Sequence, residues 1–374
     1  MSCRRLEGQK SSIYHPVCFI IPPHIVRALI STGDEEQKRW ALHALMGSQR
    51  ARTRRSIVSL MTDVSAPSTR LRRTIYDAKH GASLPAPGGD APVRNEGDHA
   101  TGDIDANEAY DFSGKTYEFY KSVYNRNSLN DKGLELVSSV HYRRSYNNAS
   151  WDGSQMEYGD GDGKLFQRFT KCIDVVGHEL THGVTSFTAN LDYQDQSGAL
   201  NESFSDVFGS LVKQYSLKQT ADKADWLIGE GLLTPNVNGK ALRSMKAPGT
   251  AYDDPKLGGK DPQPSHMKNW WNDEFNDDNG GVHVNSGIPN HAFYLVAAEI
   301  GGYAWESAGK IWYIALRDRL TATSQFKNAA KATFDTAGAI YGDKSKEQKA
   351  VEKGWEGVGV TEWNNTGIEE GIKK

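Results

Sequence analysis

The pattern of hydrophobic and polar positions gives the first part of the chain a strand-like character. Between residues 71 and 142, short runs alternate in polarity or carry β-branched and aromatic residues, which is typical of strands. The expected strands cover 74–76, 134–137 and 139–142. Residues 108–124 interrupt them with hydrophobic residues at helical spacing, so a helix is expected there.

From about residue 172 the hydrophobic positions recur at helical spacing. The expected helices span 173–187, 200–215, 291–300 and 308–320. Residues 247–280 are rich in Pro, Gly, Asp and Asn, which predicts a long irregular connection. The chain is therefore expected to have an α+β fold, with a β-rich lobe followed by a helical lobe.

The N-terminal region reads as a separate short piece. Residues 22–47 predict two short helices after Pro22-Pro23, with a break at Gly33. The basic run 50–55 then shows no periodicity, so it is either a solvated linker or a processing linker that ends a short pro-segment. The expected organisation is 1–55, pro-segment and basic linker; 56–188, β-rich lobe; 189–363, helical lobe; and 364–374, polar tail.

Composition excludes several classes of protein. The 374 residues include 37% hydrophobic and 24% charged residues, enough for two or three domains with real cores. A net charge of −3 gives no electrostatic case for a nucleic-acid partner.

No apolar run is long enough to span a membrane, and the N-terminus shows no signal-peptide pattern. Three scattered cysteines form no disulfide framework. These features predict a monomer that is cytoplasmic or released by a non-classical route.

The most informative stretch is His178-Glu-Leu-Thr-His182. On a helix, residues four apart lie about 6 Å apart along the axis and share a face, so His178 and His182 can chelate one ion. Two neutral imidazoles suit Zn²⁺, and Glu179 beside them can take a proton from a zinc-activated water. Gly177 and Gly183 bracket the motif at a cost of about 1 kcal/mol each. Such a cost predicts that something approaches this helix closely.

A second expected helix supplies acids at the same spacing. Glu202 and Asp206 are four residues apart and therefore share a face. Glu202 can complete a set of three zinc ligands that leaves a fourth position open, as catalytic zinc requires. Asp206 can accept the outer N–H of a ligating histidine and fix its tautomer. A solvated acidic face is the bland alternative, but the rest of this helix is too apolar for it.

Spacing distinguishes between classes of zinc peptidase. The metzincin pattern requires Gly and His where this chain has Thr185 and Thr188. With nineteen residues from His182 to Glu202, the chain closely resembles the thermolysin family. The resemblance covers about 74–360 and is carried, beyond the zinc motif, by 142–151, 193–202, 242–245 and 278–283. The short N-terminus with Pro22-Pro23, together with 209–217 and 246–252, is similar to the protealysin branch, whose pro-segment is short.

The resemblance implies a role for each matching residue. His178, His182 and Glu202 would bind one catalytic Zn²⁺, with Glu179 as general base. Tyr193 and His283 would donate to the oxyanion, and Asp278 would orient His283. The resemblance also implies that Asn201 and Asp206 lie behind the zinc ligands and hold them in position. The implied contacts to substrate backbone come from Asn148, Ala149, Trp151 and Arg243.

Substrate preference is implied by apolar residues at the family's pocket positions. These are Phe166, Phe169, Val175, Ile228, Leu232 and Leu242. They predict cleavage on the amino side of Leu, Phe, Ile or Val. Phe169 stands where relatives often carry a smaller aliphatic residue, which bears on the depth of the pocket.

One departure concerns the family's paired calcium site. Asp174, Asp225 and Glu230 match its acids, but Lys213 replaces one carboxylate. An ammonium group can neutralise acids that would otherwise need a divalent ion. We therefore expect calcium to be reduced or absent at this site.

The sequence thus predicts a zinc endopeptidase for peptide and protein substrates. It would be made as a zymogen, inhibited by its own pro-segment and processed between Met46 and Leu60. Two alternatives stay open: a zinc aminopeptidase, for which no acidic anchor for a substrate amine is apparent, and an inactive zincin serving as a binding module. The resemblance also makes an extracellular location possible.

Overall fold

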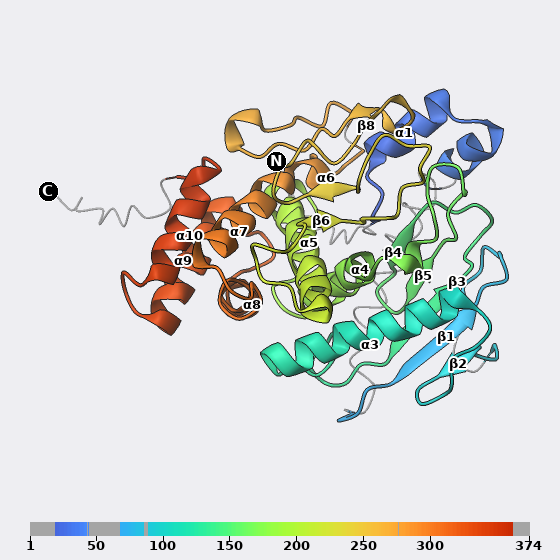
Figure 1. The fold of residues 1–374 in the computed structure, drawn as a ribbon, viewed down its shortest axis with the longest axis horizontal. Helices are drawn as coiled ribbons and strands as arrows, with labels where there is room; N and C mark the ends of the chain where they lie inside the picture. The colour runs from blue at the N-terminus through green and yellow to red at the C-terminus, as the bar shows by residue number, and fades with distance from the viewer. Residues whose placement is uncertain (1–18, 43, 45–67, 86–88, 276, 362–374) are drawn as a thin grey trace, which may run out of the picture.

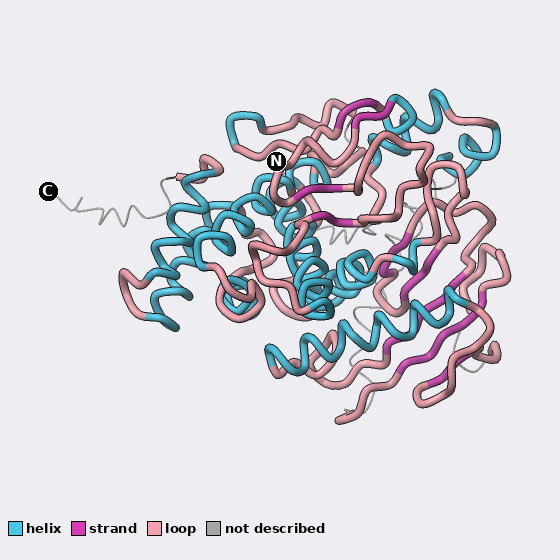
Figure 2. Tube along the Cα trace, in the orientation of Figure 1, coloured by secondary structure: helices cyan, strands magenta, loops and turns pink. Residues whose placement is uncertain are grey.

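The computed structural model describes residues 19–42, 44, 68–85, 89–275 and 277–361. The basic run 50–55, the predicted processing interval and the tail 364–374 lie outside these residues. Within the described part, the strands of the largest sheet lie at one side of the molecule and most helices at the other, while the short strand pairs lie apart from that sheet, as Figure 2 shows. This arrangement confirms the predicted α+β fold with a β-rich lobe followed by a helical lobe.

The first lobe is built on a mixed five-stranded sheet with strand order β2-β1-β3-β5-β4. Its strands are β1 (Arg73–Asp77), β2 (Arg94–Asn95), β3 (Leu136–Val140), β4 (Ala149–Trp151) and β5 (Met156–Tyr158). Strand β3 runs parallel to both β1 and β5, and β4 pairs antiparallel with β5 at the edge of the sheet.

Two predicted elements of this lobe differ in extent from the structure. In place of the two strands predicted at 134–137 and 139–142 there is one, β3, because only residues 136–140 pair in continuous register with 73–77 of β1. The helix expected from 108 begins earlier, as α3 (Ile104–Tyr124). The Asp103 carboxylate caps it by accepting the N–H groups of Asp105 and Ala106.

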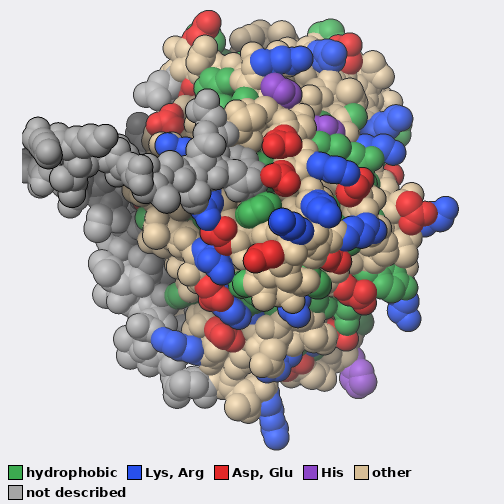
Figure 3. All heavy atoms as spheres, turned by 90° about the vertical axis from the view of Figure 1, so that its left-hand side faces the viewer, with side chains coloured by type: hydrophobic (Ala, Val, Ile, Leu, Met, Phe, Trp, Pro, Cys, Tyr) green, Lys and Arg blue, Asp and Glu red, His purple; other side chains and the backbone are tan. Residues whose placement is uncertain are grey.

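Two long helices lie between the sheet and the C-terminal helices (Figure 1). They are α4 (Ile173–Ser186) and α5 (Asp195–Leu217); most of α4 is buried, and so is α5 from residue 198 to 214. The helical lobe continues with α6 (Val282–Asn285), α7 (Gly287–Ile300), α8 (Ala308–Asp318), α9 (Phe326–Tyr341) and α10 (Lys346–Gly357). Viewed from the α8–α10 side, acidic and basic side chains are interspersed over the surface (Figure 3).

The connection across 218–281, which includes the predicted irregular segment 247–280, is largely irregular. It contains two short ribbons, β6 (Leu227–Ile228) with β7 (Arg243–Ser244), and β8 (Asp253–Asp254) with β9 (Gly259–Lys260). Its 3₁₀ turns are η3 (Pro255–Leu257) and η4 (Met267–Asn269), while η2 (Phe169–Lys171) precedes α4.

The N-terminal piece packs on this connection. Helix α1 (Pro23–Thr32) contacts η3 and lies beside β8, far from α8–α10 (Figure 1). Residues 35–42 and 44 are also helical, which confirms the prediction of two short helices. Apolar residues of both, including Ile25, Leu29 and Trp40, join the main hydrophobic core.

Candidate active site

Helices α4 and α5 cross at a pair of glycines. A Cβ added to Gly177 would lie 3.1 Å from the Cα of Gly209, and one added to Gly209 would lie 2.5 Å from the Asp174 carbonyl oxygen. Gly183 directly follows His182 at the other end of the motif, and a Cβ added there would lie 2.7 Å from the Leu129 side chain. The predicted close approach to this helix is therefore confirmed, and it is what brings the facing residues of α4 and α5 together.

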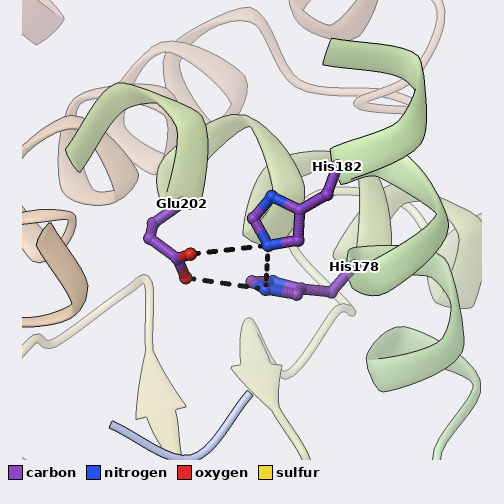
Figure 4. Close-up of side chains that lie close together, drawn as sticks. All are labelled: His178, His182 and Glu202. Carbon is purple, nitrogen blue, oxygen red and sulfur yellow. Dashed lines mark hydrogen bonds and ion pairs between the residues drawn. The ribbon is translucent and has the colours of Figure 1, made fainter. Parts of the chain in front are cut away.

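Beside this crossing, three side chains converge (Figure 4). The Nε2 atoms of His178 and His182 are 3.0 Å apart, and the Glu202 carboxylate oxygens lie 3.5 and 3.4 Å from them. Ligands about 2.0–2.1 Å from a tetrahedral zinc ion are separated by about 3.3 Å. All three residues are buried. The predicted ligand set thus has the spacing of a zinc site.

Neighbouring groups select the tautomer of both imidazoles. Nδ1 of His178 donates to the Asp206 carboxylate at 2.7 Å, and Nδ1 of His182 donates to Asn201 Oδ1 at 2.8 Å. In the neutral rings, each Nε2 therefore presents a lone pair toward the other. Among the described residues, the buried Glu202 Oε2 also has no hydrogen-bond partner. Three electron-rich atoms facing one another in a buried site fit a bound cation.

Asp206 is held from three directions. Besides His178, it accepts two hydrogen bonds from the Arg243 guanidinium, at 2.8 and 2.9 Å. Asn290 of α7 donates to it at 2.8 Å. Burial alone would raise the pKa of Asp206, but Arg243 and His178 hold it well below the usual range. Asn290 is not among the predicted residues, and its only signal in the sequence is that a polar residue stands in an apolar helix.

The predicted catalytic residues surround the triad. Glu179 is buried and its Oε2 accepts the Trp151 backbone N–H at 3.0 Å. The Tyr193 hydroxyl donates to Glu202 and lies 3.1 Å from His283 Nε2. Burial opposes a charge on His283, but Glu202 and Asp278, which accepts the His283 Nδ1–H, raise its pKa to about 9. Tyr193 and His283 therefore lie beside the predicted ligand Glu202, and Glu179 follows the predicted ligand His178 on the same helix.

Residues 19–21 occupy the cleft between the lobes. Phe19 forms an antiparallel bridge with Ser150, and Ile20 N–H donates to the Ala149 carbonyl at 3.3 Å. Ile21 N–H donates to Asn148 Oδ1 at 3.2 Å. The N-terminal piece thus extends the sheet at edge strand β4, the same strand predicted to bind substrate backbone.

Two residues of the opposite wall donate to the same segment. Arg243 Nη1 bonds the Ile20 carbonyl at 3.1 Å, and His283 Nε2 bonds the Phe19 carbonyl at 2.9 Å. Of the residues predicted to bind substrate backbone, Asn148, Ala149 and Arg243 therefore bind residues 19–21. The fourth, Trp151, donates its N–H to Glu179.

The six predicted pocket residues are all buried in one hydrophobic core, with exposed fractions of 2% or less. Leu232 and Leu242 both flank Gly229, and Ile228 pairs with Arg243 across the β6–β7 ribbon. The rings of Phe166 and Phe169 lie 6.0 Å apart. Val175 extends the apolar surface onto α4.

The acids predicted at the altered calcium site converge on Lys213. Its Nζ lies 2.7 Å from Asp225, 3.2 Å from Glu230 and 3.7 Å from Asp174. Burial opposes the charge on Lys213, but Asp174 and Asp225 raise its pKa above the usual range. An ammonium group therefore stands at the centre of these carboxylates.

A further His–acid group was not predicted. Asp103, Asp105 and His141 also lie at metal-ligand spacing within the described residues. However, both ring nitrogens of His141 already bond carboxylates, Asp160 at 2.8 Å and Asp103 at 3.0 Å. The Asp160 bond raises the pKa of His141 to about 9, against the effect of burial. A charged imidazole held by two acids has a structural role in joining α3 to the loop after β5.

Helix α1 is fastened to the loop before His283. Arg27 forms an ion pair with Asp277 and stacks over the Phe275 ring at 4.6 Å. His24 Nε2 lies 2.6 Å from the Tyr252 hydroxyl. On the other lobe, Lys164 pairs with Asp34 at 2.6 Å. The N-terminal piece therefore spans the cleft and contacts both lobes.

None of the helices in the described part of the chain is long and apolar enough to cross a membrane.

Comparisons with known proteins agree with this geometry. Residues 59–186 match the description "Thermolysin metallopeptidase, catalytic domain", and residues 189–360 match "Thermolysin metallopeptidase, alpha-helical domain". The chain is 49% identical to Protease PrtS of Photorhabdus sp. (strain Az29), over 91% of each chain. It is 48% identical to an extracellular metalloprotease of Pectobacterium carotovorum subsp. carotovorum, over 92% of this chain and 97% of that one.

A solved structure is also similar. The precursor of protealysin, a metalloproteinase from Serratia proteamaculans, is 50% identical and superposes with a TM-score of 0.82. The match covers 92% of this chain and 100% of that one.

Proposed function

The chain belongs to the thermolysin family and is a zinc metalloendopeptidase; on this premise, we propose how its residues divide the work. The observation that carries the proposal is the convergence of His178, His182 and Glu202. The three ligands would hold one zinc ion, which polarises the peptide carbonyl and activates water for attack. Asp206 and Asn201 would keep the two imidazoles in the ligating tautomer.

Glu179 would serve as the general base and later pass the proton to the leaving amine. Tyr193 and His283 lie where two donors can meet the oxyanion that forms on the attacked carbonyl. Asp278 keeps His283 charged, so its Nε2–H is available as one of these donors.

Substrate would add to edge strand β4 and form hydrogen bonds with Asn148, Ala149, Trp151 and Arg243: its N–H groups would donate to Asn148 Oδ1 and the Ala149 carbonyl, and Arg243 would donate to one of its carbonyls. The apolar pocket would select Leu, Phe, Ile or Val on the carboxyl side of the cut. Each buried methylene contributes about 0.8 kcal/mol, which supports a preference without strict selection. Peptide libraries should show this preference, and a charged residue favoured after the cut would overturn the pocket assignment.

We further propose that the N-terminal piece inhibits the precursor. Its residues 19–21 use the hydrogen bonds that substrate backbone would need. Processing between Met46 and Leu60 would release it. The intact precursor should therefore have far lower activity than the processed enzyme, and a fully active precursor would contradict inhibition.

Lys213 would take the place of calcium. Its single positive charge, set among three carboxylates, leaves little electrostatic gain for a divalent ion. A calcium-selective chelator should leave thermal stability unchanged; a large loss would contradict this.

Names of relatives suggest where the enzyme acts. One is called an extracellular metalloprotease, and we propose that this protein also acts outside the cell. Finding it only in cell lysates and never in culture medium would overturn this proposal.

One assay tests the main proposal. An unfolded protein is digested with and without a zinc chelator, and the variant Glu179→Gln is run in parallel. Internal cuts that disappear in both controls support the assigned roles. Release of N-terminal residues alone indicates an aminopeptidase, and no cutting at all indicates an inactive binding module.

A further inference from the structure

Residues 19–21 lie between the lobes in one definite register relative to the proposed substrate-binding residues. Phe19 offers its carbonyl to His283, and the next residue, Ile20, offers its carbonyl to Arg243. Ile21 then places its N–H on Asn148. Three consecutive residues thus meet three groups of the proposed substrate site in order.

We propose that the Phe19–Ile20 peptide bond occupies the scissile position and is hydrolysed by the protein's own active site. This inference rests on the proposed function, and it concerns a second bond, distinct from the processing interval between Met46 and Leu60. It turns the inhibitory segment into a slow substrate.

The contacts fix which bond is meant. His283 is the proposed oxyanion donor, and its Nε2 lies 2.9 Å from the Phe19 carbonyl oxygen. The attacked carbonyl is therefore that of Phe19. The residue after the attacked bond is Ile20, whose carbonyl accepts from Arg243 at 3.1 Å.

Burial supports the same register. Ile20 is fully buried, and Ile21 is 1% exposed. A β-branched aliphatic residue directly after the cut is what the proposed pocket prefers. A segment that inhibited only by covering the cleft would need neither a hydrophobic residue at this position nor three backbone contacts in order.

The chemistry is a simple hydrolysis. The oxygen of water bonds to the Phe19 carbonyl carbon as the C–N bond to Ile20 breaks. The proton removed from water goes to the Ile20 nitrogen, which leaves as an amine. The products are a carboxylate on Phe19 and a new N-terminus at Ile20.

Contacts beyond the cleft would hold the second product in place. Residues after Ile20 remain attached through the His24–Tyr252 and Lys164–Asp34 contacts and the Arg27 ion pair. Residues 1–19 lose their covalent link to this anchor. The cut would therefore produce a nicked precursor that stays inhibited until the anchored part is removed.

The test follows the fate of the purified precursor. We expect N-terminal sequencing and intact mass to show a new terminus at Ile20, at a rate independent of protein concentration. The Glu179→Gln precursor should show no such terminus. If processing between Met46 and Leu60 runs to completion and an unfolded protein is digested while Phe19–Ile20 stays intact, this inference is wrong and the proposed function stands. If nothing is cut in any of these assays, the proposed function fails with it.

Variants at the new terminus sharpen the result. Ile20→Leu should keep the cut, and Ile20→Lys should slow it at least tenfold. Because Ile20→Lys could also undock the segment, synthetic peptides of residues 15–36 with Ile or Lys at this position are given to the processed enzyme. Cleavage after Phe19 only in the Ile peptide supports the register, and equal cleavage of both contradicts it.

Discussion

The paired helices α4 and α5 carry two sites where electron-rich side chains face one another and need a positive charge. The two sites obtain that charge in different ways. Near one end of the pair, two neutral imidazoles and Glu202 turn their lone pairs toward one another. Near the other end, Asp174, Asp225 and Glu230 surround the Lys213 ammonium. The first site requires a cation from solution, whereas the second contains its own.

The difference separates function from stability. A site that must keep a ligand position open for chemistry depends on an exchangeable ion with an incomplete protein shell. A site that only joins segments of the fold is equally well served by a side chain. Lys213 links α4, α5 and the β6 region without any change in metal supply.

The substitution with the largest expected effect tests whether catalysis at the first site can be lost while metal binding is kept. Glu179→Gln removes the proposed base while leaving the three ligands intact. We expect kcat/KM to fall about 10³-fold, with the zinc content unchanged. Steady-state kinetics and elemental analysis on the same sample check both parts. A variant that lost zinc as well would show that Glu179 supports the site rather than the reaction.

Removing the internal cation should destabilise the second site. Lys213→Ala leaves three carboxylates without a partner, and we expect the free energy of unfolding to fall by about 3–5 kcal/mol. The matched control is Lys331→Ala, which removes a more exposed ion pair with Asp335 and should cost under about 1 kcal/mol. Denaturant unfolding measures both, and equal losses would contradict a special role for Lys213.

A charge reversal at Lys213 would make the second site, like the first, depend on a cation from solution. Lys213→Glu places a fourth carboxylate among the others, a set of oxygen ligands that suits Ca²⁺. We expect this variant to be unstable alone and to regain thermal stability on adding calcium. The wild type should not respond to calcium in the same measurement.

The glycine crossing couples the two sites mechanically. In Gly209→Ala, the new Cβ would lie 2.5 Å from the Asp174 carbonyl oxygen and 3.0 Å from the His178 nitrogen, so the helices must separate. We expect a loss of about 2 kcal/mol in unfolding free energy and weaker zinc retention. Gly102→Ala, which has open space around it, is the control. A neutral Gly209→Ala would show that the crossing is not tightly packed.

A third place, on the N-terminal piece, gathers positive charges around a histidine. His24 is half-buried, and its loss of solvent together with the charges of His283, Arg27 and Arg243 lowers its pKa from 6.5 to about 3. A docked pKa below the undocked one means that docking is fully stable above pH 6.5 and weakens as the pH falls toward 3.

We therefore expect acid to loosen the N-terminal piece. Between pH 7 and pH 5, hydrogen-exchange protection of the α1 amides in the Glu179→Gln precursor should fall about tenfold, after correction for intrinsic exchange. In His24→Gln, which cannot titrate, protection should stay constant over this range. An equal fall in both variants would assign the effect to another group.

Local patterns predicted most of the metal centre. His178, His182, Glu202 and Asp206 fall at four-residue spacings on two helices, so one turn of helix decides that they share a face. Lys213 among acids was likewise visible as a departure from a family pattern. These predictions needed only short-range geometry and one pairing of helices.

Other features depend on contacts between distant segments. Asn290 meets Asp206 across 84 residues, and the Phe19 carbonyl meets His283 across 264. No local pattern encodes such pairs. The strand ends in 134–142 were misjudged for the same reason, because the partner β1, rather than β-propensity, decides where β3 begins and ends.

The most direct test of the account is the metal content of the active enzyme measured together with its activity. Protein stripped with a strong chelator is given zinc or calcium in steps, and digestion of an unfolded protein and thermal stability are followed. The account predicts that activity rises with zinc up to one ion per chain and that calcium restores nothing. Full activity without zinc, or stability that depends on calcium, would contradict it.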